Sequence, residues 1–594
     1  MNVPTIEQLL TGYREHRFTP ASVIDAVLAR IDAAPERHVW ITRLTRERIM
    51  EYVAKLEGKS PDALPLYGVP FAIKDNIDLA GVPTTAACPD FAYVPPQSAV
   101  VVQRLIDAGA IPVGKTNLDQ FATGLVGTRS PYGACRNGFN DDYISGGSSS
   151  GSAVAVATGL VSFSLGTDTA GSGRVPAAFN NIVGMKPSCG LLSTRGVVPA
   201  CRSLDCVAIF ALTATDARSV LQVARGFDAE DAYSRQVALT SFGHRPLRIG
   251  VPRQDQLEFF GDCAYARLFE HAGDRVRTLG ATIVAIDCSP LFEAARLLYE
   301  GPWVAERYAV IEDFLASHPD AVYPVTASII SAGGKATAVA GFRAQYRLKE
   351  LQRRAARLWT DIDVLMLPTA GTIYPTTEVE ANPVALNSNL GRYTNFVNLL
   401  DQAAIAVPAG FRPDGLPFGV TLIAPAGSDH GLLDLGAALH HAAGLNVGTS
   451  DAPVPAPTAP APVPEGYIAV AVCGAHMSGL PLNHQLIDRN AFQLSATRTA
   501  PKYHFFALPG GPPRRPGLLR VAQGGGAIDV EVWAVPQQSF GSFVSGIPSP
   551  LGIGKIELAD GTLCSGFLCE SWAVEGGQEI TALGSWRAYL ASQS

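Results

Sequence analysis

Two segments rich in glycine and serine, separated by a run of small apolar residues, constrain this chain more than any other feature. The segments are GGSSSGS at 146–152 and GTDTAGSG at 166–173. Because glycine and serine relax the steric limits on the backbone, consecutive N–H groups can point toward one place and hold an anion. The pattern therefore predicts two turns that flank a buried element, although two flexible Gly/Ser loops would have a similar composition.

A serine hydroxyl in such a turn becomes a nucleophile only when a base removes its proton. No histidine lies within residues 143–187, whereas Lys74 follows the apolar run VPFAI, which is typical of a buried strand. A solvated lysine has a pKa of about 10.4, and burial lowers that pKa because it disfavours the charged form. Lys74 is therefore a candidate base, and the alternative is a surface lysine paired with Asp75.

These segments, with GVPFAIKDN at 68–76, resemble in order and spacing the signature of the amidase signature family, whose members hydrolyse or transfer amide bonds with a Ser-Ser-Lys triad. By this resemblance Ser172 is the nucleophile, Ser148 is the bridging serine that relays its proton, and Lys74 is the base. The resemblance also implies a cis peptide bond between Gly147 and Ser148.

The resemblance further implies an oxyanion hole on the nucleophile loop. The backbone N–H groups of Thr169, Ala170 and Gly171, together with that of Ser172, would face the oxygen that becomes negative during attack. Such donors stabilise the transition state more than the substrate.

Residues 291–314 resemble the substrate-recognition helix of the allophanate hydrolase branch of this family. One helix would carry Tyr299 and Arg307 on one face, about 12 Å apart along the axis. Since a guanidinium grips a carboxylate through paired hydrogen bonds, Arg307 is expected to anchor a small carboxylated urea, with Tyr299 at its urea end. The backbone of Gly124 would contribute to the same pocket. A surface Arg307 paired with a neighbouring glutamate, and a plain turn at Gly124, are the alternatives.

The chain changes character after residue 448. Residues 449–465 are rich in Pro and Ala with almost no charge, which favours an extended polyproline II spacer. Residues 1–448 are therefore expected to form one domain and residues 466–594 another. The second has short β-rich runs separated by Gly and Pro turns, and it resembles the γ-glutamylcyclotransferase-like C-terminal domain of allophanate hydrolases.

The expected fold class is α/β. Residues 5–33 have the periodicity of two amphipathic helices, and strands and helices alternate after residue 98 and again after residue 247. The resemblance implies a mixed, twisted sheet covered by helices in the first domain and a small β-rich α+β fold in the second.

The segment GAHMSGLPLNHQL places His476 and His484 near a glycine turn that follows a strand. Histidine is the commonest group for proton transfer near neutral pH. In the family a second step breaks down N-carboxycarbamate, so His476, and after it His484, are candidates for that step. Two structural histidines, in a domain that serves docking or assembly, are the alternative.

Composition excludes several other classes. A formal net charge of -7 argues against a nucleic-acid surface, and no apolar run of about twenty residues is present to span a membrane. Ten cysteines are scattered without a CxxC motif, which favours reduced thiols in a cytoplasm. We expect no metal and no cofactor, because no metal-ligand spacing and no nucleotide or flavin motif stands out.

The resemblance thus implies an amidohydrolase that converts allophanate and water to ammonia and carbon dioxide by way of N-carboxycarbamate. Family analogy also implies a homodimer. It places such an enzyme downstream of a biotin-dependent urea carboxylase, with which it would associate, or of cyanuric acid breakdown. The alternative is a general amidase that acts on another small amide. Arg307 separates the two, because a buried cation has no partner when the substrate is neutral.

Overall fold

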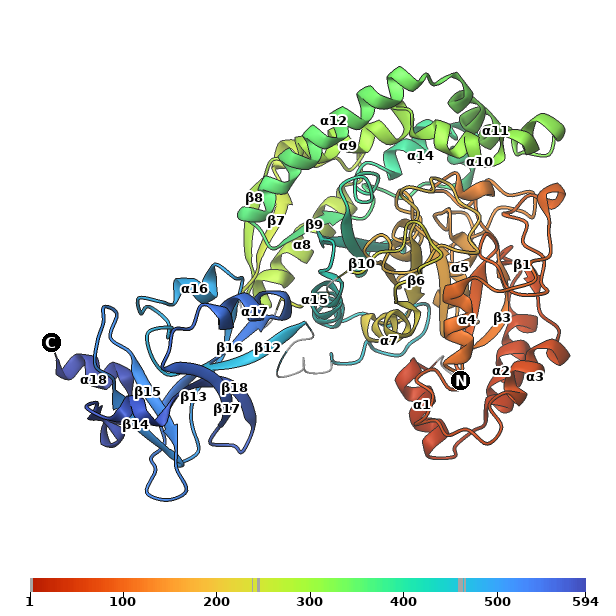
Figure 1. The fold of residues 1–594 in the computed structure, drawn as a ribbon. Coiled ribbons are helices and arrows are strands. Elements are labelled where there is room, and N and C mark those ends of the chain that lie inside the picture. Colours follow the sequence, from red (N-terminus) through yellow and green to blue (C-terminus); the bar gives the residue numbers. More distant parts are fainter. Residues whose placement is uncertain (1–3, 238, 243–245, 458–462, 464–465, 594) are drawn as a thin grey trace. The chain divides into compact units, whose positions relative to one another are not determined.

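The structure is a computed structural model that describes residues 4–237, 239–242, 246–457, 463 and 466–593 (Figure 1). The chain divides into two compact units, which consist of Met1–Val237 with Pro246–Thr458 and of Ala238–Arg245 with Ala459–Ser594. No sequence pattern indicated that the short segment Ala238–Arg245 belongs with the C-terminal residues. The spacer expected at 449–465 lies partly outside the described residues, and its first part packs on the first unit, where Thr449 N–H donates to the Ala157 carbonyl.

The first unit contains a large sheet. Its strands are β1 (Trp40–Arg43), β2 (Pro70–Lys74), β3 (Ile111–Thr116), β4 (Phe163–Thr167), β5 (Val183–Lys186), β6 (Val207–Ala211), β7 (Arg248–Pro252), β8 (Thr282–Ile286), β9 (Val364–Pro368), β10 (Gln402–Phe411) and β11 (Pro417–Pro425). They lie in the order β1-β3-β2-β4-β6-β5-β10-β11-β9-β7-β8. Strand β2 is parallel to β3 and β4, and β7 is parallel to β8 and β9, whereas β10 and β11 are antiparallel. The expected mixed α/β sheet is confirmed.

Helices pack around this sheet. They are α1 (Ile6–Arg14), α2 (Pro20–Ala33), α3 (Arg46–Ala54), α4 (Val100–Asp107), α5 (Ser150–Ala157), α6 (Val175–Phe179), α7 (Ala214–Ala224), α8 (Cys263–Thr278), α9 (Ser289–Glu300), α10 (Trp303–Ser317), α11 (Pro324–Ser331), α12 (Ala338–Ala356), α13 (Thr376–Ala381), α14 (Ala385–Leu390) and α15 (Asp429–Ala442). Helices α9 to α12 gather at the top of the first unit in Figure 1.

The run between the two Gly/Ser segments forms α5 and β4, and every residue of both elements is buried. Small side chains allow this burial. At Gly151 an added Cβ would lie 2.3 Å from the Val39 carbonyl oxygen, so the backbone of α5 approaches its neighbours too closely for any larger residue. The two serine-bearing turns are therefore held at the ends of a rigid, solvent-free helix and strand.

The prediction of a single helix over residues 291–314 is wrong, because the structure has two helices there. The chain leaves α9 after Glu300, passes Gly301 and Pro302, and enters α10. Proline has no N–H group for the helical ladder, and its ring clashes with the preceding turn, so the helix ends there. The break changes the geometry of two candidate residues, because Tyr299 and Arg307 lie on different helices.

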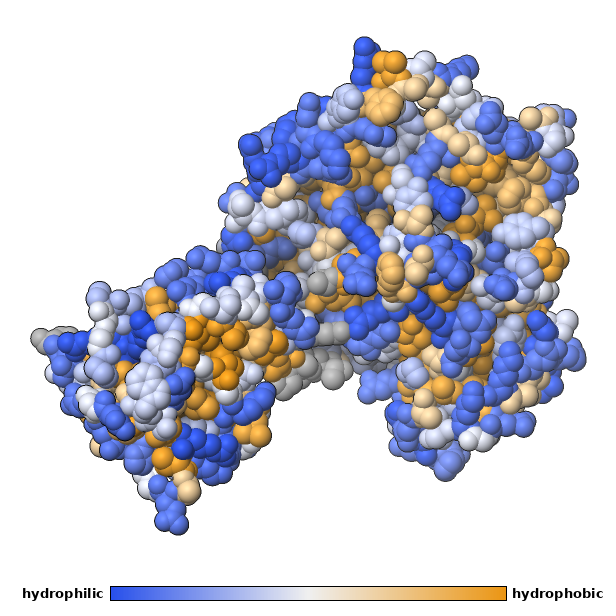
Figure 2. Space-filling view, in the orientation of Figure 1, coloured by the Kyte–Doolittle hydropathy of each residue, from blue (hydrophilic) through white to orange (hydrophobic). Residues whose placement is uncertain are grey.

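The second unit has a five-stranded sheet and a three-stranded sheet. Its strands are β12 (Tyr467–Val472), β13 (Phe492–Arg498), β14 (Tyr503–Ala507), β15 (Pro516–Arg520), β16 (Asp529–Pro536), β17 (Leu551–Glu557), β18 (Leu563–Cys569) and β19 (Gln578–Glu579), and its helices are α16 (His484–Ile487), α17 (Gln537–Ser545) and α18 (Trp586–Ser592). The strand orders are β13-β16-β12-β18-β17 and β15-β14-β19. Figure 2 shows a hydrophobic patch on this unit among hydrophilic residues.

Candidate active site

The end of β2 brings Lys74 to the first Gly/Ser turn. Lys74 is fully buried, and its Nζ lies 2.8 Å from Ser148 Oγ and 2.7 Å from Thr167 Oγ1. Strand β2 is parallel to β4, so the ends of both strands meet at the same edge of the sheet, where Thr167 is the last residue of β4. The peptide bond between Gly147 and Ser148 is cis. No sequence argument had singled out Thr167.

Burial changes the protonation of this lysine. The loss of solvent lowers the pKa of Lys74 to about 7, although the carboxylates of Asp119, Asp205 and Asp168 raise it in part. The charge of Arg307 lowers it further. With a pKa near 7, about half of the molecules carry a neutral amine at pH 7, compared with roughly one in 2,500 for a solvated lysine. The amine can therefore accept a proton.

The nucleophile loop is built around a buried ion pair. Asp168 and Arg174 are both fully buried, and Arg174 Nε lies 2.8 Å from Asp168 Oδ2. The Asp168 carboxylate also accepts the N–H groups of Gly171 (2.7 Å) and Gly173 (3.0 Å). These bonds hold the backbone on both sides of Ser172, which is 4% exposed.

The expected oxyanion donors differ in whether they already have a hydrogen-bond acceptor. The Gly171 N–H group donates to Asp168 Oδ1 at 2.7 Å, so it already has an acceptor in this structure. Within the described ranges, no residue accepts a hydrogen bond from the N–H of Thr169, Ala170 or Ser172. Those three groups are therefore available to a developing oxyanion.

Asp119 is an organising residue that the sequence analysis missed. Its carboxylate accepts the N–H groups of Val126 (3.1 Å), Gly127 (3.0 Å) and Arg129 (3.0 Å). An added Cβ at Gly147 would lie 2.1 Å from Asp119 Oδ2, so only glycine fits before the bridging serine. Asp119 stands in a polar turn after β3, and no local pattern distinguishes a carboxylate of this kind from a surface one.

Arg307 and Tyr299 meet instead of lying two helical turns apart. Arg307 is 3% exposed, and its Nη2 lies 3.5 Å from the Tyr299 hydroxyl. Its Nη1 donates to Thr123 Oγ1 at 3.0 Å and to the Ala122 carbonyl at 3.3 Å, directly before Gly124. Arg307 forms no ion pair with a carboxylate of any described residue. The expected alternative of a surface arginine paired with a glutamate is therefore wrong.

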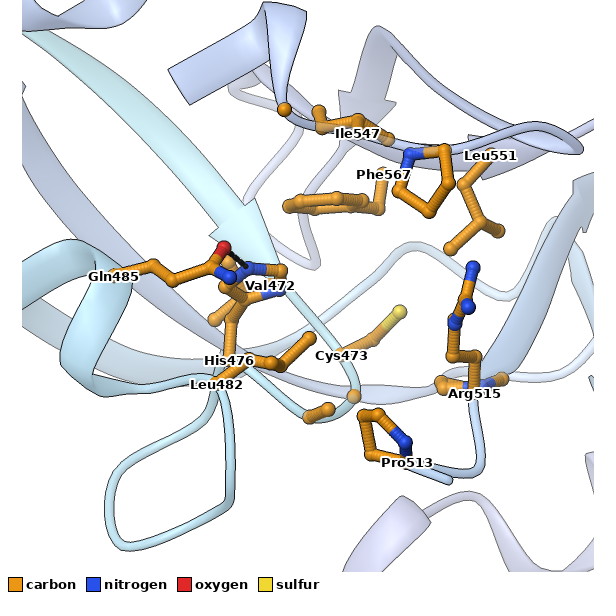
Figure 3. Close-up of a pocket in the computed structure, with 15 residues that line it drawn as sticks. Val472, Cys473, His476, Leu482, Gln485, Pro513, Arg515, Ile547, Leu551 and Phe567 are labelled. Carbon is orange, nitrogen blue, oxygen red and sulfur yellow. Dashed lines mark hydrogen bonds between the residues drawn. The ribbon is translucent and has the colours of Figure 1, made fainter. Parts of the chain in front are cut away.

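A separate pocket lies in the second unit (Figure 3). It has a volume of about 210 Å³, and His476 lines it, hydrogen-bonded through Nε2 to Gln485 Oε1 at 3.0 Å. The imidazole stacks on Phe567, with ring centroids 5.0 Å apart, and burial lowers the pKa of His476. Arg515 faces it across the pocket, a residue that the sequence analysis did not consider.

His484 does not share this pocket. It is the first residue of α16, it is exposed, and its Nδ1 lies 2.9 Å from the Pro481 carbonyl oxygen. Of the two candidate histidines, His476 lines this pocket and His484 does not. Among the described residues there is no group of three or more His, Cys, Asp or Glu that could hold a metal ion, and no helix there is long and apolar enough to cross a membrane.

Known proteins resemble the chain over both units. A family profile described as Amidase matches residues 22–433, and one described as Allophanate hydrolase C-terminal domain matches residues 468–591. Urea amidolyase of Saccharomyces cerevisiae is 44% identical over an alignment of 585 residues, and the match covers 96% of this chain and 32% of that protein. The chain thus spans about a third of the length of that relative.

Two further relatives cover different parts. The structure of selenomethionine-substituted Kluyveromyces lactis allophanate hydrolase is 42% identical, with a TM-score of 0.82 over 100% of this chain and 99% of that one. One component of the glutamyl-tRNA(Gln) amidotransferase of Prochlorococcus marinus is 34% identical over an alignment of 469 residues, and the match covers 73% of this chain and 93% of that protein. The family match and these relatives show that the chain belongs to the amidase family and carries an allophanate hydrolase C-terminal domain.

Proposed function

We propose that this protein is an amidohydrolase that converts allophanate and water to ammonia and carbon dioxide by way of N-carboxycarbamate. The observation that carries the proposal is Arg307, a buried cation without a carboxylate partner in the described structure. An unpaired buried charge is costly, so a substrate that brings a carboxylate restores the balance. Asp205 and Glu306 favour the charged guanidinium from a distance, but a substrate carboxylate could pair with it directly, and a neutral amide could not.

The first step uses the buried amine. Neutral Lys74 accepts the proton of Ser148, Ser148 accepts that of Ser172, and Ser172 Oγ attacks the amide carbonyl carbon. The free N–H groups near Ser172 stabilise the oxyanion. Ammonia leaves with the returned proton, and water then hydrolyses the acyl-enzyme to N-carboxycarbamate.

Arg307 and Tyr299 supply substrate recognition in this proposal. The guanidinium binds the carboxylate of allophanate, and the Tyr299 hydroxyl bonds the urea end. The backbone of Gly124, which follows the Ala122 and Thr123 groups that Arg307 contacts, binds the same substrate. The proximity of Arg307 and Tyr299 supports a small substrate, because both groups can reach one molecule of a few heavy atoms.

The second step belongs to the pocket of the C-terminal unit. N-carboxycarbamate carries two carboxylates, and Arg515 can pair with one of them. His476 relays a proton from solvent to the nitrogen as carbon dioxide leaves, and the carbamate that results takes up a second proton and releases ammonia and a second carbon dioxide. Gln485 holds the imidazole in place. His484 takes no part in this step because it lies outside the pocket.

Exposed apolar side chains and the similarity to urea amidolyases indicate how the protein assembles and with what it acts. Helix α12 exposes Val339, Phe342 and Tyr346 at 59%, 58% and 65%, spaced so that they share a face, which supports a homodimer. Because the chain matches part of urea amidolyases, we also propose that it acts beside a urea carboxylase, in a cytoplasm that suits its free cysteines.

Ammonia release from allophanate, urea, malonamate and a neutral amide, measured side by side, tests the proposal. The wild-type protein should prefer allophanate, and Ser172→Ala should abolish release from every substrate. Equal turnover of the neutral amide would favour a general amidase instead.

A further inference from the structure

A second buried lysine has no carboxylate partner either. Lys186, the last residue of β5, is fully buried, and its Nζ donates to the Pro187 carbonyl at 2.8 Å and lies 3.7 Å from Cys189 Sγ. Lys186 forms no ion pair with a carboxylate within the described part of the chain. Since an isolated buried ammonium is costly, the neighbouring sulfur is the group that can balance its charge.

A second thiol accompanies the first. Strands β5 and β6 are antiparallel neighbours, so Cys189, just after β5, and Cys206, just before β6, lie at the same edge of the sheet. Cys206 is buried and Cys189 is partly exposed. The Cys206 thiol donates to the Pro187 carbonyl at 3.2 Å, and the same carbonyl accepts from Lys186 Nζ, which contacts Cys189 Sγ. Both sulfurs therefore lie beside the Lys186 amine and the Pro187 carbonyl.

The charged groups around Cys189 favour its ionised form. The neighbouring Cys206 thiol and the charge of Lys186 lower the pKa of Cys189 to about 6, although burial opposes them. Arg235 Nε donates to the Cys189 carbonyl and its guanidinium adds positive charge, while Asp401, which pairs with Arg235, opposes ionisation. The same interaction raises the pKa of Cys206.

We propose that Cys189 is a reactive thiolate and that a peroxide converts it, with Cys206, into a disulfide. The Cys189 thiolate attacks one peroxide oxygen, so the O–O bond breaks and hydroxide leaves, giving a sulfenic acid. The Cys206 sulfur then attacks that sulfur, the S–O bond breaks, and the departing hydroxide takes the Cys206 proton as water. Two thiols are oxidised and one peroxide is reduced to two waters.

This site touches the nucleophile loop. The Cys206 carbonyl accepts the Asp168 N–H at 2.7 Å, and the Asn398 amide donates to the carbonyls of Asp168 and Leu204. A disulfide that moves residues 204–206 would therefore move Asp168 and the loop it orders. We expect oxidation to slow the amidase step about tenfold or more.

Thiol labelling tests the thiolate independently of any activity. Iodoacetamide rates are measured by peptide mass spectrometry on the full chain at pH 6.5 and pH 8.0, with the exposed Cys263 as internal reference. An ordinary thiol with a pKa of about 8.5 slows roughly twentyfold over this range, whereas Cys189 should slow less than about twofold. Lys186→Met should restore the ordinary slope. No labelling of Cys189, or a slope equal to that of Cys263, would overturn the proposal.

Peroxide treatment tests the disulfide. Peptide mapping should find a Cys189–Cys206 link, and a thiol reductant should remove it and restore ammonia release. In Cys206→Ser, peroxide should oxidise Cys189 without forming the link, and Cys189→Ser should keep its activity under peroxide. Oxidation of Cys189 beyond sulfenic acid in the wild-type protein, without a link, would refute the role of Cys206. If Cys189→Ser still lost its activity under peroxide, the proposed coupling of the disulfide to the nucleophile loop would be refuted.

Discussion

Thr167 determines which way the amine of Lys74 faces. A neutral amine has one lone pair and two hydrogens, so it can donate to Thr167 Oγ1 at 2.7 Å while its lone pair accepts the Ser148 proton. Motifs identified Lys74 and Ser148 before the structure was known, because each lies in a conspicuous local pattern. Thr167 was missed since its role depends on a contact with a residue 93 positions away.

Thr167→Val should therefore lower kcat with little change in KM. Valine has nearly the shape of threonine but no acceptor, so the amine can rotate away from Ser148. We expect a loss of about tenfold to a hundredfold, measured as steady-state ammonia release. Thr167→Ser, which keeps the hydroxyl, is the matched control. An unchanged kcat in the valine variant would exclude this orienting role.

Arg307 should govern selectivity more than rate. Arg307→Ala removes charged hydrogen bonds worth roughly 1.5–3 kcal/mol each, so KM for allophanate should rise about tenfold to a hundredfold. Turnover of a neutral amide should change little when it is measured above about pH 8, where Lys74 stays largely neutral although the loss of the Arg307 charge raises its pKa. Arg307→Lys keeps the charge but loses the planar fork, so its KM for allophanate should lie between those of the wild-type protein and Arg307→Ala. Equal loss on both substrates would show that Arg307 supports the fold instead.

At the scale of elements, the sequence predicted strands and helices well and their junctions poorly. Helices α1 and α2 form where periodicity placed them, and each begins with a threonine cap, Thr5 and Thr19. The break at Gly301 and Pro302 was overlooked, although proline is a local signal, because the flanking apolar pattern reads continuously. Asp119 was out of reach, since its partners are backbone N–H groups that only the folded loop brings together.

The docking of α1 on α7 should depend on pH. Asp216 Oδ1 accepts the Ile6 N–H at 2.9 Å, Oδ2 has no partner among the described residues, and burial raises the Asp216 pKa to about 7. Between about pH 4 and pH 7 the folded chain keeps a proton that the unfolded chain loses, so the free energy of unfolding falls as pH rises.

Asp216→Asn should remove this dependence, because the amide keeps the acceptor oxygen and does not ionise. The difference in Tm between Asp216→Asn and the wild-type protein, read by differential scanning fluorimetry, should shift in favour of the variant from pH 5 to pH 8. Asp216→Ala, which also loses the hydrogen bond, controls for that loss. A constant difference would contradict the shifted pKa.

At the scale of the whole molecule, each of the two units is proposed to carry out one of the two reactions. The family resemblance and the composition indicated the second unit. Neither could show that His476 lines the pocket of that unit and that His484 does not. That difference arises from tertiary packing against Phe567, which lies 91 positions from His476.

His476→Asn in the full chain should separate catalysis from docking. If the C-terminal pocket is catalytic, the first ammonia should appear at the normal rate while N-carboxycarbamate accumulates, as followed by ¹³C NMR of labelled allophanate. The exposed His484→Asn is the control and should behave as the wild-type protein. Normal breakdown of the intermediate in His476→Asn would favour a docking role for the unit.

The pH dependence of kcat/KM for the first ammonia released from allophanate shows directly whether neutral Lys74 is the base. With the pKa of Lys74 near 7, kcat/KM should level off above about pH 8 and fall about tenfold per pH unit below pH 6, and Lys74→Met should reduce it to background. A flat profile down to pH 5, or substantial ammonia release by Lys74→Met, would contradict a neutral buried lysine as the base.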